Sequence, residues 1–139
     1  MSPQEVIEQQ TQFMAEELTQ GNFDNVLEFF LMVPSFYELL PQLLLDERFR
    51  VRTGVYMLLQ DLAERGARDL EIAADWITPL VDHDDPRIRA EAATALEVVG
   101  DEKHLQALRL LLRDPIVQVA QMAQDAIEEI QTRLQSKPC

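Results

Sequence analysis

Three stretches of this chain superpose on one another without gaps, and this internal repeat restricts the fold more than any other feature of the sequence. They begin at residue 39 (LLPQLLLDERFRVRTGVYMLL), residue 76 (WITPLVDHDDPRIRAEAATAL) and residue 107 (ALRLLLRDPIVQVAQMAQDAI). Their starts are 37 and 31 residues apart, so the difference falls in the connecting segments. A period of this length is typical of solenoids, in which each repeat is one small structural unit stacked on the next.

The apolar residues of each stretch predict two helices. In the first half the apolar residues fall at i, i+1, i+4 and i+5, and in the second half they follow spacings of 4, 3 and 1, each of which marks a single buried helical face. The first-half positions are Leu39, Leu40, Leu43 and Leu44; Trp76, Ile77, Leu80 and Val81; and Ala107, Leu108, Leu111 and Leu112. The second-half positions are Val51, Val55, Leu58 and Leu59; Ile88, Ala92, Ala95 and Leu96; and Val119, Ala123, Ala126 and Ile127.

A short polar turn separates the two halves of each stretch. The turns contain Asp46, residues 82–86 and the pair Asp114–Pro115. Aspartate accepts hydrogen bonds from the free N–H groups at a helix start, and proline suits the first helical turn. Each stretch therefore reads as a helix, a tight turn and a second helix.

Residues 1–33 match the repeat less well but predict a further hairpin. A polar helix ends near Gly21, and the segment NVLEFFLMV forms a second, very apolar helix. We therefore predict an all-α fold, a right-handed α-α superhelix (solenoid) of about four helical hairpins in a single domain, 1–139. Residues 1–33 form a divergent N-terminal capping hairpin, and the repeats span residues 35–66, 69–100 and 102–134.

The segment DPRIRAEAATAL, residues 85–96, carries the strongest family resemblance, and LLPQLLLDERFRVR, residues 39–52, adds to it. Both resemble HEAT repeats, in the short variant also found in phycobilisome-lyase-like proteins. The resemblance implies a hydrogen-bonded ladder between adjacent repeats, in which Asp46 pairs with Arg52 and the acidic turn around His83 pairs with Arg89. The third repeat departs from this pattern, because Ala120 stands where the arginine is expected.

In proteins of this family the second helix of each hairpin lines the inner surface, so the resemblance also implies where a partner binds. Tyr56 and Met57 are the strongest candidates, because an aromatic ring and a thioether give contact area at low entropic cost. The alternative is that these side chains face water or neighbouring helices, and Arg87, in a hairpin turn, could equally pair with nearby acids. The predicted partner-binding residues are Thr53, Tyr56, Met57, Gln60, Arg87, Ala90, Ala93, Thr94, Glu97 and Gln124.

Five of the nine aromatic residues lie within residues 23–37. A helix that is apolar nearly all round is either buried or docked on another molecule. One interpretation is that this segment covers the exposed side of the hairpin stack. The other is a surface for self-association, which would give a homodimer through Phe23, Phe29, Phe30 and Phe36.

The net charge of −13 is unevenly distributed, since no Lys or Arg precedes Arg48 while residues 1–47 contain nine acids. This charge argues against nucleic-acid and anionic membrane partners, because both require a basic surface. It is compatible with solubility alone or with a basic partner. No long apolar run is present, so we expect a cytoplasmic protein.

The sequence contains no arrangement of residues that predicts catalysis, a cofactor or a metal. The single cysteine, Cys139, excludes a disulfide within the chain, and the turn at Asp82–Asp85 with His83 is interpreted as a helix cap rather than a metal site. His104 is predicted to be a surface residue. We therefore predict a non-catalytic interaction module, an adaptor or assembly factor with a protein partner. The alternatives are a self-associating structural protein and a lyase-like protein that assists chromophore attachment.

Overall fold

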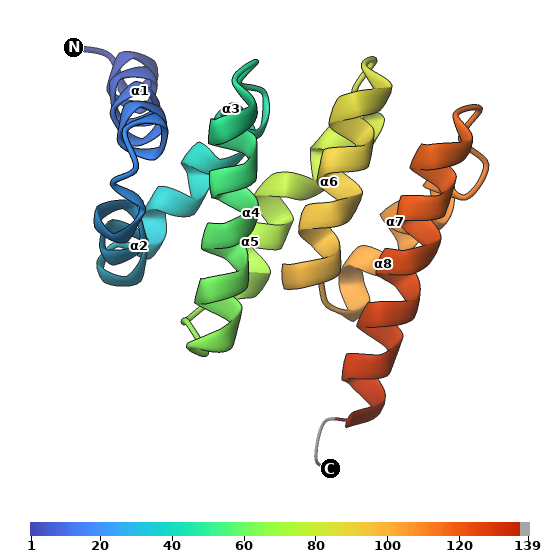
Figure 1. Ribbon diagram of the computed structural model, residues 1–139. Coiled ribbons are helices and arrows are strands. Elements are labelled where there is room, and N and C mark those ends of the chain that lie inside the picture. Colours follow the sequence, from blue (N-terminus) through green and yellow to red (C-terminus); the bar gives the residue numbers. More distant parts are fainter. Residues whose placement is uncertain (137–139) are drawn as a thin grey trace. The chain divides into compact units, whose positions relative to one another are not determined.

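The structure is a computed structural model that describes residues 1–136, and Cys139 lies outside them. These residues form eight α-helices and three short 3-10 helices, labelled η, and contain no strand (Figure 1). In chain order the helices are α1 (Pro3–Thr19), α2 (Phe23–Met32), η1 (Pro34–Leu39), α3 (Leu40–Leu44), α4 (Phe49–Glu64), α5 (Leu70–Ile77), η2 (Thr78–Asp82), α6 (Pro86–Val99), η3 (Glu102–His104), α7 (Leu105–Leu111) and α8 (Val117–Ser136). The prediction of an all-α chain is confirmed.

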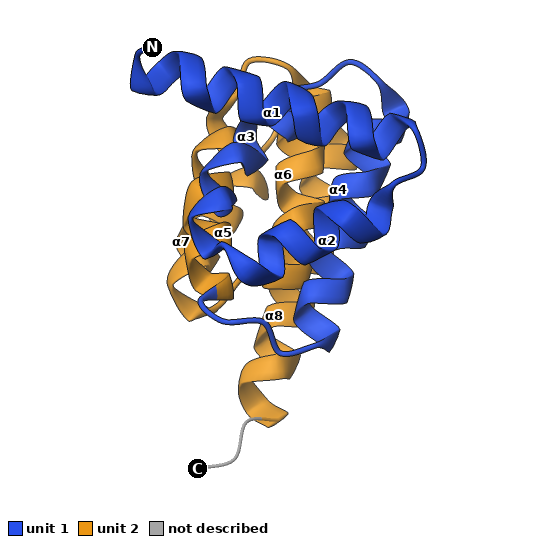
Figure 2. Cartoon of the chain, turned by 90° about the vertical axis from the view of Figure 1, so that its left-hand side faces the viewer, with its two compact units in different colours: residues 1–69 blue, residues 70–139 orange. Residues whose placement is uncertain are grey.

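The chain divides into two compact units, Met1–Asp69 and Leu70–Cys139 (Figure 2). Unit 1 contains hairpin 1, formed by α1 and α2, and hairpin 2, formed by η1–α3 and α4. Unit 2 contains hairpin 3, formed by α5–η2 and α6, and hairpin 4, formed by η3–α7 and α8. Within each unit the second hairpin packs on the first, since α4 contacts α1 and α2, and α8 contacts α6.

Prolines explain why the first helices of hairpins 2 and 3 are irregular. Pro41 and Pro79 have no backbone N–H, so neither can donate the hydrogen bond to the fourth preceding carbonyl that an α-helix requires. The chain near each proline tightens into a 3-10 helix, η1 before Pro41 and η2 around Pro79. These first helices are therefore short segments that change their winding partway along.

Side chains and backbone conformation set the helix ends. The Asp85 carboxylate accepts the Arg87 N–H at 2.9 Å and caps α6, while the Ser2 hydroxyl accepts the Glu5 N–H and caps α1. Gly21, with φ +82°, ends the first helix in a conformation that a side chain would strain. The sharp turns needed for hairpins thus arise at the residues whose chemistry predicts them.

The core follows the second-half positions of the repeat. All twelve positions predicted from the spacings of 4, 3 and 1 are buried, none more than 6% exposed. Two first-half positions are wrong, because Trp76 is 45% exposed and Leu112 is 40% exposed. The superposition places Trp76 opposite Leu39, but Leu39 ends a 3-10 helix whereas Trp76 lies in an α-helix, and the two helices turn by different amounts per residue. Leu112 lies beyond the last residue of α7.

Candidate protein-binding surfaces

An arginine joins the two hairpins of unit 2 at their turns. Arg89 of α6 forms a bidentate pair with Asp114, with Nε to Oδ2 at 2.7 Å and Nη2 to Oδ1 at 3.1 Å. Its Nη1 also donates to the carbonyls of His83 and Asp84, both at 3.0 Å. The Arg89 hydrogen bonds lower the pKa of Asp114, against the opposing effect of burial. Arg89 therefore bridges its own turn and the next one, as the resemblance implied, with Asp114 as the carboxylate partner.

This pair gives a prediction for acid stability. Because the pKa of Asp114 is lower in the folded chain than in the unfolded chain, the ionised carboxylate stabilises the fold above about pH 4 and ceases to do so as the pH falls through the lowered value. We expect Asp114→Asn to lower Tm at pH 7 by about 3–6 °C. Thermal melts from pH 7 to pH 2.5 should show this difference shrinking below pH 4, whereas the exposed control Asp82→Asn should change Tm little at any pH.

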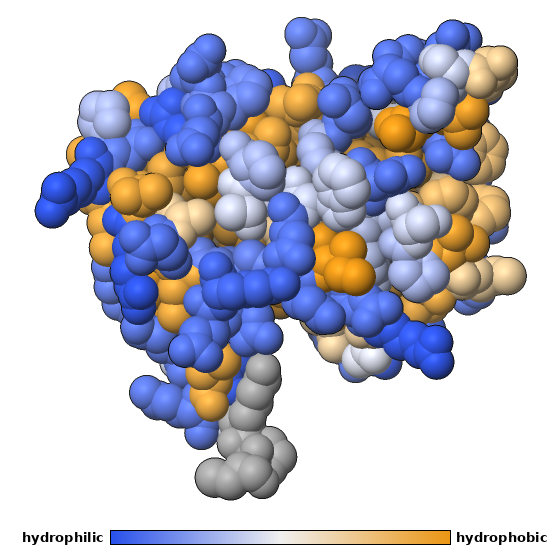
Figure 3. Space-filling view, turned by 180° about the vertical axis from the view of Figure 1, so that it is seen from behind, coloured by the Kyte–Doolittle hydropathy of each residue, from blue (hydrophilic) through white to orange (hydrophobic). Residues whose placement is uncertain are grey.

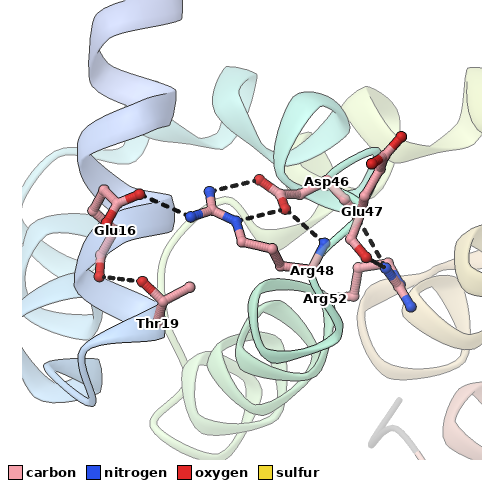
Figure 4. A network of polar contacts seen from close by, with 6 residues as sticks. All are labelled: Glu16, Thr19, Asp46, Glu47, Arg48 and Arg52. Atoms are coloured by element: carbon pink, nitrogen blue, oxygen red, sulfur yellow. Dashed lines mark hydrogen bonds and ion pairs between the residues drawn. The ribbon is translucent and has the colours of Figure 1, made fainter.

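Unit 1 has an equivalent network at the turn between α3 and α4 (Figure 4). Arg48 binds the Asp46 carboxylate through Nε and Nη2, each at 3.0 Å, and binds Glu16 of α1 through Nη1 at 2.8 Å. Arg52 donates Nη1 to the backbone carbonyls of Asp46 and Glu47. The hydrogen bond from Arg48 lowers the pKa of Asp46. Arg52 thus reaches Asp46 through its carbonyl, while the Asp46 carboxylate ties the turn to α1 through Arg48.

His104 is buried, at 2% exposure, so its prediction as a surface residue is wrong. Its Nδ1 accepts the Asp101 N–H at 2.8 Å, which leaves the ring proton on Nε2, 2.8 Å from Asp75 Oδ1. Asp75 also binds Lys103 at 3.0 Å. Partial burial raises the pKa of Asp75, but the hydrogen bonds from His104 and Lys103 outweigh it, and the pKa is lowered overall. This polar contact connects α5 of hairpin 3 with η3 of hairpin 4.

The two partners of Asp75 should contribute very differently to stability. We expect His104→Ala to lower the free energy of unfolding by about 2 kcal/mol, since it removes a buried side chain and leaves the Asp101 N–H without its acceptor. Lys103→Ala should change it by under about 0.5 kcal/mol, because the ion pair of Lys103 is solvent-exposed. Urea denaturation followed by circular dichroism measures both values. Equal effects would show that His104 is not the residue that fixes η3.

The predicted residues of α4 lie together on one face, opposite its buried stripe. Thr53, Tyr56, Met57 and Gln60 follow the i, i+3, i+4, i+7 spacing of a single helical face. Met57 is 47% exposed and Tyr56 is half-buried, with its hydroxyl accepting a hydrogen bond from Gln60 Nε2 at 3.1 Å. This set, the α4 face, presents an accessible thioether beside an aromatic ring whose hydroxyl is held by a neighbour.

The predicted residues of unit 2 are only partly brought together. Ala90, Thr94 and Glu97 are half-buried along one flank of α6, and Arg87 is exposed at its start beside Asp85 at 3.7 Å. Ala93 is fully buried, so its assignment as a partner contact is wrong: α6 buries a wider arc than one stripe.

Helix α8 contributes a residue that the sequence did not single out. Met122 is 37% exposed and lies 3.8 Å from the Thr94 hydroxyl, sulfur to oxygen. Gln124 comes two positions later, about 200° around the helix from Met122, and donates to Glu128 instead. Only the contact between α6 and α8 reveals Met122, because its exposure depends on which flank of α8 packs. We call Arg87, Ala90, Thr94, Glu97 and Met122 the α6/α8 face.

The α6/α8 face is electrostatically negative at one end. Burial raises the pKa of Glu97, Asp125 and Glu129 raise it further, and Arg133 opposes them. The Arg133 guanidinium itself donates to the carbonyls of Glu97 and Gly100, where α6 ends. A carboxylate whose charged form is disfavoured by its surroundings gains from a cation that approaches it. The carboxylates of Glu97, Asp125 and Glu129 and the guanidinium of Arg133 thus lie close together at this end of the face.

The aromatic residues of unit 1 form a connected cluster. Ring centroids lie 5.8 Å apart for Phe13 and Phe29, 6.4 Å for Phe29 and Phe36, and 6.1 Å for Phe30 and Phe36, each pair edge-to-face. Phe30 and Tyr37 are buried, at 0% and 1% exposure, so the assignment of Phe30 to a self-association surface is wrong. Its ring lies in the inner layer, in contact with Phe36 and Tyr37 of η1.

The outer layer of this cluster surrounds a small pocket. Phe13 is 49% exposed and Phe29 is 36% exposed, and hydrophobic side chains gather over α1 and α2 (Figure 3). Phe23 is half-buried at the start of α2 and does not line the pocket. The pocket has a volume of about 210 Å³ and is lined by Gln9, Gln10, Phe13, Met14, Phe29 and Phe36. We call Phe13, Phe29 and Phe36 the aromatic end.

Comparison with known families decides the identity of the repeat. A family model described as HEAT repeats matches residues 37–128, which span hairpins 2 and 3 and most of hairpin 4. The chain belongs to the HEAT-repeat family. Comparisons with curated proteins and with solved structures gave no match.

As a HEAT-repeat protein, the chain is an all-α solenoid, and this part of the fold prediction is confirmed. HEAT repeats commonly mediate contacts between proteins. The phycobilisome-lyase-like subtype and the hand of the superhelix stay predictions. Among residues 1–136, no helix is both long enough and apolar enough to cross a membrane.

Proposed function

We propose that this HEAT-repeat protein is a non-catalytic adaptor or assembly factor that binds a protein segment on its second-helix faces. The observation that carries the proposal is the α4 face, where Met57 is 47% exposed beside Tyr56 on a helix whose opposite side is fully packed. An exposed thioether and a positioned aromatic ring are typical of protein contacts, since they offer area with little loss of side-chain freedom on binding.

The α6/α8 face supports the same proposal for unit 2. Thr94 and Met122 bring together two helices, and Glu97 adds a carboxylate that a basic group of the partner would stabilise. Charged residues at such a face affect the orientation of the partner and the rate of association more than they affect the affinity for it. We therefore expect the apolar contacts that contribute most to affinity on the α4 face, and the preference for a basic partner on the α6/α8 face.

A pull-down with matched variants tests the proposal. The full chain is immobilised, exposed to lysate of its source cells, and the retained proteins are quantified by mass spectrometry. The double variant Tyr56→Ala with Met57→Ala should lose a defined protein that the wild type retains. The control is Leu110→Ala with Leu112→Ala, which removes as many exposed large side chains (63% and 40% exposed) from another surface and should retain that protein. Identical retention by all three chains would contradict the proposal.

A second alternative, besides self-association, is assistance in chromophore attachment, which rests on the resemblance to lyase-like HEAT proteins alone. Fold similarity is a weak guide to chemistry. The absorbance spectrum of the protein purified from its source cells tests it, since a bound pigment would add a visible band.

A further inference from the structure

The aromatic end of unit 1 is a prearranged surface. Phe13, Phe29 and Phe36 come from three different elements, α1, α2 and η1, and meet in edge-to-face contacts. Beneath them Phe30 and Tyr37 are buried, and the Tyr37 hydroxyl donates to the Arg68 carbonyl at 2.9 Å. The exposed rings therefore rest on a fixed layer, and a partner would lose little free energy in ordering them.

The size of the pocket limits what can enter it. A volume of about 210 Å³ lies below the range of about 300–1,000 Å³ that is usual for small-molecule sites. It suits one large side chain of another protein, and the edges and faces of three surrounding rings would pair well with an aromatic ring. Adjacent exposed side chains, Met32 at 74% and Val33 at 36%, extend the apolar surface beyond the pocket.

The charge around the pocket selects the kind of partner. Residues 1–47 contain nine acids and no Lys or Arg, and Glu5 on α1 and Glu28 on α2 are exposed. Two copies joined through this end would bring carboxylates against carboxylates, which costs free energy unless cations intervene. The same charge repels nucleic acid and anionic lipid. A segment with basic residues around an apolar anchor complements both features.

We propose that the aromatic end binds a basic segment of a partner protein, which inserts one large apolar side chain between Phe13, Phe29 and Phe36 while its Lys and Arg residues meet the carboxylates of α1 and α2. This surface is distinct from the α4 and α6/α8 faces. The proposal can therefore hold or fail independently of the proposed function.

Selection from a random peptide library tests the proposal. Displayed 12-residue peptides are selected on the immobilised full chain, with depletion on the Phe13→Ser, Phe29→Ser double variant. We expect enrichment of peptides with a Phe, Trp or Leu and at least two Lys or Arg within four residues of it. Enrichment of acidic or uncharged peptides, or no enrichment over the depleting variant, would overturn the proposal.

Binding constants of the selected peptides provide the matched controls. Phe29→Ser should weaken binding at least about tenfold, while Phe49→Ser, which removes a ring that is 71% exposed elsewhere in unit 1, should leave it unchanged. Glu28→Lys, and for the wild type a rise from 50 to 500 mM NaCl, should each weaken peptide binding relative to the wild type at 50 mM NaCl. Melting curves must show that the variants fold.

Light scattering completes the test, because it measures whether the protein is a dimer. A dimer of the wild type that Phe29→Ser dissociates would assign this end to self-association and overturn the assignment to a basic segment.

Discussion

Replacing Phe30 with alanine should lower the free energy of unfolding by about 3–5 kcal/mol, whereas the same replacement at Phe29 should lower it by about 1 kcal/mol. The two rings are neighbours in sequence, but Phe30 is fully buried and Phe29 is 36% exposed. Removing the buried ring loses its transfer free energy and leaves a cavity, while removing the exposed ring loses mainly one edge-to-face contact on each side. Urea denaturation followed by far-UV circular dichroism measures both changes.

This pair of variants separates stability from binding at the aromatic end. Phe29→Ala should remain folded and lose peptide binding, and Phe30→Ala should be impaired through stability. Equal destabilisation by the two replacements would show that the cluster has no distinct inner and outer layer. The proposed basic-segment site would then lose its structural basis.

A second large effect is expected at Gly100, where alanine should lower the free energy of unfolding by about 3 kcal/mol. Its φ of −71° is available to any residue, so the requirement for glycine is one of space. A Cβ atom would lie 2.5 Å from the Leu96 carbonyl oxygen and 2.8 Å from Ile130 Cδ1. The first of these is backbone and cannot move aside without disturbing the end of α6.

Gly54 provides the matched control for Gly100. A Cβ atom there would lie 3.0 Å from Cδ2 of Leu18, the far end of a flexible side chain. Alanine also has the higher helix propensity by about 1 kcal/mol, which offsets this contact. We expect Gly54→Ala to lie within about 1 kcal/mol of the wild type. If thermal melts place Gly100→Ala equally close to the wild type, then the space at Gly100 between the Leu96 carbonyl and Ile130 is larger than described.

The repeat predicted the second helices far better than the first. Spacing alone located residues such as Val55, Leu96 and Ala123 in the core, because each residue of a regular α-helix is rotated about the helix axis by the same angle. The number of residues between two positions therefore determines whether they share a face. The first helices of hairpins 2 and 3 change between α and 3-10 winding near prolines, so equivalent sequence positions such as Leu39 and Trp76 point in different directions. Hydrophobicity cannot distinguish these cases, since both residues are large and apolar.

Tertiary contacts account for most of what the sequence left open in the candidate sites. Helical spacing was enough to predict that Thr53, Tyr56, Met57 and Gln60 share one face of α4, although their role in binding stays a prediction. The burial of Ala93 and the exposure of Met122 depend on how α8 packs against α6. Phe30 and Phe13 depended on tertiary packing in the same way, since Phe13 is 49% exposed while Phe30 is buried against Phe36 and Tyr37. Composition indicated an aromatic surface but not which rings form it.

Site-specific photo-crosslinking tests the central claim, that the second-helix faces bind protein, most directly. A photoreactive phenylalanine analogue is placed at Met57, at Met122 or, as a control, at Leu110, and the chain is irradiated in its source cells. We expect discrete protein adducts from Met57 and Met122, and none of the same mass from Leu110. No adduct from Met57 or Met122, or the same adducts from all three positions, would contradict the account.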